Sequence, residues 1–198
     1  MGLFTELRNE CLIKELQHEL NTDVLLFGFD GFTYFGCLQN IDDCRIAVLT
    51  PAMEAETSNV EILTTGGELH EVNFARVDLW QIVAKGTCIK NDPIEYSHKG
   101  NSAVTLAAVD AGNSDRQESH DLICLLKRMI GEEVVITTLG GFLFEGVLSD
   151  VEDELAILKV DDIFVPGTSS SISGDDVRSV VVNLEALTSV SKGFNCCK

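Results

Sequence analysis

The stretches that decide the fold are VLLFGFDGFTYFGCL at residues 24–38 and VVITTLGGFLFEGVL at residues 134–148. Each has an apolar run, a two-residue turn and a second run, and Asp-Gly or Gly-Gly at such a turn is typical of a tight β-hairpin. A glycine then falls inside the second run, Gly36 in one stretch and Gly146 in the other, where it marks a sharp bend or a close backbone approach. We therefore predict two hairpins whose second strand is bent.

Both stretches belong to a longer internal repeat. Shifting the sequence by 110 residues places residues 12–49 on residues 122–159 without a gap, and an offset of 105 residues matches the later apolar runs. The identical pairs include Leu12 and Leu122, Val24 and Val134, Gly31 and Gly141, Phe32 and Phe142, Gly36 and Gly146, Val77 and Val182, and Leu79 and Leu184. Each copy is long enough to enclose a small core, and two copies are too few for a solenoid.

Each copy is predicted to contain one helix followed by five strands. The first helix follows Thr5 and ends at Asn21, and the second begins at the expected N-cap Ser119 and ends at Gly131. The third strands are expected at residues 45–49 and 155–160, variable loops at 50–59 and 167–174, and the last strands at 72–79 with 82–83 and at 177–184 with 187–190. A helix with five short antiparallel strands describes a small bent barrel, so the predicted fold is mostly β. We expect a first domain at residues 1–86, a linker at 87–118 and a second domain at 119–198.

The chain is strongly acidic. Its 14 Lys and Arg against 32 Asp and Glu give a net charge of −18, spread over both copies rather than held in a tail. Such a surface repels phosphate backbones, which disfavours general nucleic-acid binding. No apolar run approaches the ~20 residues that cross a bilayer, so no membrane partner is expected. Seven cysteines without metal or redox spacing favour a reducing cytoplasm and predict no metal or cofactor.

Both copies resemble the Sm and Sm-like (LSm) family through its first motif. The second copy reads GVLSDVEDELAIL from Gly146, and the first reads GCLQNIDDCRIAVL from Gly36, with glycine, hydrophobic and acidic residues at the family's positions. This resemblance implies two tandem Sm-like five-stranded barrels, each with an N-terminal helix.

The residues that hold nucleotides in RNA-binding family members are replaced. Ala156 and Ile46 stand at the position of the pocket asparagine, and Asn183-Leu184 and Asp78-Leu79 stand where the family has Arg-Gly. The residues on the corresponding loops are candidate ligand-facing positions: Asp42, Asp43, Asp78, Glu152, Asp153 and Asn183. Their carboxylates lack the spacing of a calcium loop and are read as solvated charge rather than a metal site. RNA recognition through the family's pocket is therefore not expected.

The resemblance also implies assembly, because family members pair strand four of one subunit with strand five of the next. Three chains with two modules each would close a ring of six. The apolar run Val180, Val181 and Val182 is the candidate oligomer edge, although it suits the core of an isolated domain equally well. We expect a non-catalytic homo-oligomer that acts as a scaffold or protein-binding module, and the alternative is an RNA-binding ring using a non-standard face. No catalytic motif occurs, and a role for Cys196-Cys197 stays open.

Overall fold

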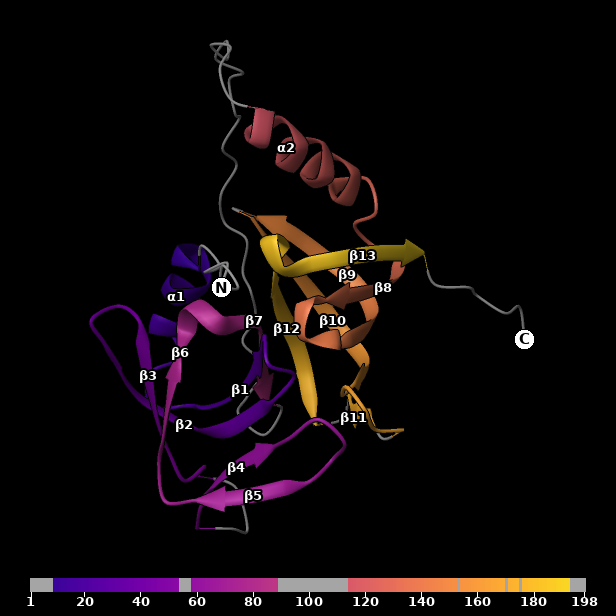
Figure 1. Cartoon of the computed structure of the whole chain (residues 1–198). Coiled ribbons are helices and arrows are strands. Elements are labelled where there is room, and N and C mark those ends of the chain that lie inside the picture. Colours follow the sequence, from indigo (N-terminus) through magenta and orange to yellow (C-terminus); the bar gives the residue numbers. More distant parts are fainter. Residues whose placement is uncertain are drawn as a thin grey trace, which may run out of the picture.

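The computed structural model describes residues 9–53, 58–88, 114–152, 154–169, 171–174 and 176–192. These residues form two α-helices and one antiparallel sheet of thirteen strands (Figure 1). The main path of the sheet runs β13-β8-β9-β10-β12-β7-β1-β2-β3-β6. The expectation of a mostly β fold is confirmed. We call residues 9–88 the first half and residues 114–192 the second half.

The first half begins with a short helix on a curled sheet. Its elements are α1 (Glu10–Gln17), β1 (Asp23–Gly28), β2 (Thr33–Asp42), β3 (Ile46–Thr50), β4 (Val60–Leu63), β5 (Leu69–Val72), β6 (Ala75–Asp78), the 3₁₀ turn η1 (Leu79–Gln81) and β7 (Ile82–Cys88). The β4–β5 hairpin was not predicted: Val72, expected to open the fourth strand, ends β5, and that strand begins at Ala75.

The second half follows a similar order, with the single short strand β11 (Ser171–Ser173) where the first half has the β4–β5 hairpin and an additional 3₁₀ turn after its first strand. Its elements are α2 (Ser114–Lys127), β8 (Glu133–Thr138), η2 (Leu139–Gly141), β9 (Leu143–Glu152), β10 (Leu155–Phe164), β11, β12 (Val177–Asn183), η3 (Leu184–Ala186) and β13 (Leu187–Lys192). Ser119, the expected N-cap and the expected start of the second domain, lies inside α2. The strand expected to end near residue 83 continues to Cys88 as β7, and the rest of the expected linker up to residue 113 lies outside the described residues.

Strand registers in the two halves correspond residue by residue. Leu26 pairs with Lys85 in the first half, and Ile136 pairs with Val190 in the second, which reproduces the offsets of 110 and 105 residues. The third strand departs from the ungapped match, because Ala47 lies opposite Val77 as Ala156 lies opposite Val182. The β2–β3 turn is thus one residue longer than the β9–β10 turn. Ala47, and not Ile46, is the counterpart of Ala156.

The predicted close approach at the in-strand glycines is confirmed. A Cβ built on Gly146 would lie 2.2 Å from the Lys159 carbonyl oxygen, and one on Gly36 would lie 2.7 Å from that of Thr50. Both distances are shorter than any carbon–oxygen contact a side chain tolerates. Two residues after each glycine the pairing with the next strand shifts register, at Leu38 and at Leu148. Such irregularities let β2 and β9 bend and the sheet curl.

Two hydrophobic cores lie in this sheet, and each contains side chains from both halves. The core of the second half includes Leu25 and Phe27 of β1, and Phe27 meets Phe142 and Phe144 edge-on at 5.2 and 5.3 Å between ring centroids. The core of the first half includes Leu155 and Val181. The two halves therefore share their buried surface.

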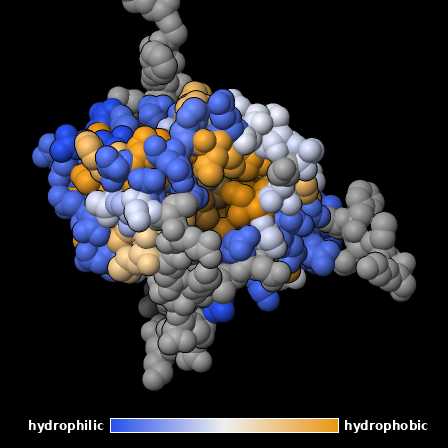
Figure 2. All heavy atoms as spheres, turned by 90° about the horizontal axis from the view of Figure 1, so that it is seen from below, coloured by the Kyte–Doolittle hydropathy of each residue, from blue (hydrophilic) through white to orange (hydrophobic). Residues whose placement is uncertain are grey.

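The surface carries both hydrophilic side chains and exposed apolar ones. Figure 2 shows apolar side chains gathered in one hollow on the face seen from below, with hydrophilic side chains around it. Among the described residues, large apolar side chains are exposed at single positions: Phe74, 61% exposed, precedes β6, and Leu125, 48% exposed, lies on α2. Within the described residues, no helix has the length and apolar character needed to span a bilayer.

Candidate functional site

The two halves are joined by strand pairing between β7 and β12. Val180 lies opposite Gly86, Val181 opposite Lys85 and Val182 opposite Ala84, in an antiparallel ladder. We call this pairing, residues 84–88 with residues 177–182, the seam. The other edge of β12 is paired with β10. Val180, Val181 and Val182, the candidate oligomer edge, are therefore paired within their own chain and are not a free edge between chains.

The seam is buried on both faces, which explains the unbroken apolar run. Val180 and Val182 pack into the core of the second half, whereas Val181 packs into the core of the first. Successive side chains of a strand point to opposite faces, so only a strand covered on both sides is apolar at consecutive positions. Burial of these valines stabilises the joint by about 1.5–3 kcal/mol per side chain.

A buried ion pair lies at the seam. The Lys85 ammonium donates to Glu19, and the Thr87 hydroxyl donates to the same carboxylate oxygen at 3.1 Å. The side chains of Lys85 and Glu19 are only 1% and 7% exposed. Sequence reasoning missed this pair. The available signal was a single lysine within the apolar run IVAKGTC at residues 82–88.

A second polar link ties α1 to both halves. The Asn9 side chain at the start of α1 donates to the carbonyl oxygens of Leu79 and Ile82, the latter at 2.8 Å, and accepts from the Asn183 amide of β12. Asn9 and Asn183 are each 1% exposed. The link spans the end of the seam, and nothing in the local sequence around Asn9 marks it.

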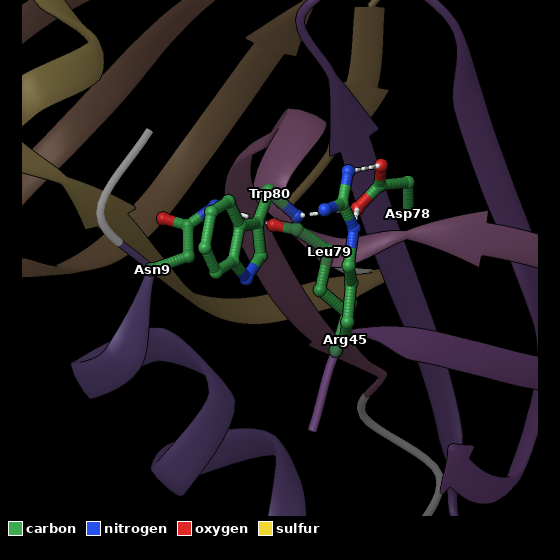
Figure 3. Close-up of polar contacts among 5 residues, drawn as sticks. All are labelled: Asn9, Arg45, Asp78, Leu79 and Trp80. Carbon is green, nitrogen blue, oxygen red and sulfur yellow. Dashed lines mark hydrogen bonds and ion pairs between the residues drawn. The ribbon is translucent and has the colours of Figure 1, made fainter. Parts of the chain in front are cut away.

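The turn between β6 and β7 carries a cluster of charged and aromatic groups (Figure 3). Arg45 donates to both carboxylate oxygens of Asp78, at 3.0 and 2.6 Å, and its guanidinium lies 4.9 Å from the centre of the Trp80 ring. Asp78 also accepts from the Trp80 backbone N–H at 3.1 Å and so caps η1. Arg45 is thus held in the bidentate and stacked geometry that a guanidinium favours.

The predicted ligand-facing residues do not form one site. Asp42, Asp43 and Asp78 lie around one pair of adjoining turns, which the Leu79 N–H to Arg45 carbonyl bond of 2.8 Å joins. Glu152 and Asn183 flank the corresponding turns of the second half, joined by the Leu184 N–H to Glu154 carbonyl bond of 2.9 Å. Asn183 is buried and caps η3, so it does not face a ligand. Asp153 lies outside the described residues, as do Cys196 and Cys197.

The same turns each contain a capped 3₁₀ segment. Asp78 and Asn183 precede the 3₁₀ turns η1 and η3, and each side chain accepts from the backbone N–H two residues on. On the third strands, the equivalent residues Ala47 and Ala156 are both fully buried. Alanine offers no hydrogen-bonding group to a base edge. In the part of the chain that the structure describes, no group of three His, Cys, Asp or Glu could hold a metal ion.

Two titrating groups of the first half are perturbed by their surroundings. Burial raises the pKa of the Cys37 thiol, which the Asp23 charge reinforces and the Gln39 side chain partly offsets. Burial, the Asp30 charge and a hydrogen bond to Asp30 raise the pKa of Tyr34. Both groups are therefore held in their protonated forms, which makes Cys37 a poor nucleophile at neutral pH.

The main path of the sheet ends in two unpaired edges. Among the described residues, β6 pairs only with β3, and β13 pairs only with β8. By the register correspondence, β6 is the counterpart of β12, and β13 is the counterpart of β7. The chain thus exposes, at opposite ends of its sheet, one copy of each strand that meets at the seam.

No model of a known protein family matches the sequence, and no curated protein matches it.

Proposed function

We propose that this chain is a non-catalytic protein of two tandem Sm-like barrels that assembles with its own copies through the free edges of β6 and β13. The assembly then acts as a scaffold or protein-binding module. Three chains, with two barrels each, close a ring of six.

The observation that carries the proposal is the seam. It joins β7 of one half to β12 of the other, and their counterparts β13 and β6 stand unpaired at the two ends of the main path of the sheet. An unpaired edge invites another strand, and a head-to-tail interface that closes on itself pairs both ends of the main path of the sheet. The net charge of −18 favours protein contacts over RNA.

Light scattering coupled to size-exclusion chromatography tests the assembly. A species of three times the chain mass is expected, which dissociates on dilution. A single-chain mass at every concentration would overturn the proposal.

Proline substitutions at two neighbouring exposed residues of β13 provide a matched pair. The backbone N–H groups of successive residues in a strand point to opposite edges of that strand. One of the two variants, Ser191→Pro and Lys192→Pro, therefore removes an N–H that points outward, and the other removes an N–H that points toward β8. The outward variant is expected to lose assembly while keeping the thermal stability of a folded chain. Equal assembly in both variants would show that the β13 edge is not used.

A further inference from the structure

Helix α1 does more than cover its own half. A groove is lined by Cys11, Lys14 and Glu15 of α1 on one side and by Leu155, Ile157 and Val181 of the second half on the other. The groove lies alongside the seam, so α1 reaches across the joint onto β10 and β12. Leu12 and Ile13 of the same helix are 0% and 6% exposed.

Among the described residues, nothing covers the second helix in this way. Leu122 and Ile123, the counterparts of Leu12 and Ile13, are only half-buried, although Leu126 is as fully buried as its counterpart Leu16. The helix is thus seated on its own half but stays uncovered on the side where α1 meets the neighbouring half. The strand counterparts Ile46 and Val48 at the opposite end of the sheet are also half-buried.

We propose, on the basis of the proposed function, that α2 of one copy docks across the β13–β6 joint onto β3 and β6 of the next copy. The register correspondence places Leu125 at the position of Glu15, over Ile46 and Val48. It places Asp121 at the position of Cys11, facing Arg76, the counterpart of Val181. The occupant of the uncovered strand face is therefore a second copy of this chain.

Charge and polarity complement each other across this contact. Arg76 and Asp121 are both exposed in the single chain, and a carboxylate beside a guanidinium gains strength as water is removed around it. Leu125 stands at the position that the charged Glu15 has in the internal groove. Its apolar side chain would contact the half-buried side chains of Ile46 and Val48. In the same register Val77 lies opposite Ser189, and Arg76 lies opposite Val190, in the partner copy.

A charge-reversal cycle on the full-length chain tests the docking. Arg76→Glu and Asp121→Arg are each expected to raise the dissociation constant of the assembly on the order of tenfold, and the double variant is expected to recover most of that loss. Lys127→Glu, an exposed reversal on the same helix at a position with no counterpart in the groove, is expected to change it by less than about twofold. Sedimentation velocity measures the constants, and circular dichroism verifies that each variant is folded.

Interchain disulfide formation between Arg76→Cys and Val190→Cys separates this inference from the proposed function. Arg76→Cys with Lys192→Cys, two positions out of register, serves as the control, and mass spectrometry locates the bond among the native cysteines. A register-specific disulfide without charge coupling would overturn the docking of α2 and leave edge assembly standing. A chain that stays monomeric would overturn both.

Discussion

Lys85 shows how one residue can define a joint between repeats. It lies opposite Val181 in a strand that is buried on both faces, and Glu19 supplies its opposite charge. The other carboxylate oxygen of Glu19 is buried without a hydrogen-bond partner among the described residues. Desolvation of both ions offsets much of their attraction, so the pair specifies the joint more than it stabilises it.

In the second half, two apolar residues occupy the positions that correspond to this ion pair. The counterparts of Glu19 and Lys85 are Met129 and Val190, both half-buried. Lys85→Val alone leaves Glu19 as an unpaired buried carboxylate and is expected to lower the free energy of unfolding by about 3–5 kcal/mol. The double variant Glu19→Met with Lys85→Val is expected to have a free energy of unfolding no more than ~1 kcal/mol below that of the parent.

Urea unfolding monitored by circular dichroism measures the free energy of unfolding of both variants. If the double variant were as unstable as Lys85→Val, the cost would come from lost packing rather than from an unpaired charge. Lys159→Val, at an exposed strand position, controls for the loss of a lysine as such.

Asn9 connects α1 to the β6–β7 turn and to β12, so its side chain stabilises the positions of these elements relative to one another. One amide satisfies two carbonyl groups at the β6–β7 turn and the Asn183 amide of β12, all in a buried site. Asn9→Ala leaves these groups without that partner, and we expect a loss of about 3 kcal/mol in the free energy of unfolding. Thermal and urea unfolding check the value.

Asn40→Ala is the matched control. The Asn40 side chain makes one exposed hydrogen bond to Asp42 at 2.6 Å, so its removal is expected to cost less than about 0.5 kcal/mol. A similar cost at Asn9 would mean that water replaces the lost amide.

Sequence reasoning succeeds where the chemistry is local. Gly36 and Gly146 mark close approaches because a side chain at either position would strike the next strand, and the flanking turns follow from glycine. The β4–β5 hairpin carried a similar signal, since Gly66-Gly67 stands between its two strands, but residues 60–71 were not assigned to any element. The seam could not be predicted, because Lys85 and Val181 are neighbours only after both halves have folded. The extra residue in the β2–β3 turn changes the offset between the third strands of the two halves by one residue. Only the strand pairing in the structure reveals this change.

At the scale of the whole molecule, the shared cores bind the halves into one cooperative unit. Phe27 of the first half is fully buried against Phe142 and Phe144 of the second, and Val181 is buried in the first core. Neither core is complete without side chains from the other half. The first half would therefore expose Phe27, Ala84 and Lys85 if the second half unfolded.

This coupling predicts a single unfolding transition. Trp80, the only tryptophan, packs against the core of the first half and reports on that half alone, whereas far-ultraviolet circular dichroism reports on both. Leu148→Ala removes a fully buried side chain from the other core and is expected to cost about 2–5 kcal/mol. Because the cores share residues, the midpoint followed by Trp80 fluorescence is expected to fall together with the circular-dichroism midpoint. A Trp80 midpoint that stayed at the parent value while circular dichroism showed an earlier transition would mean that the halves unfold independently, and that the seam holds two finished domains together rather than completing them.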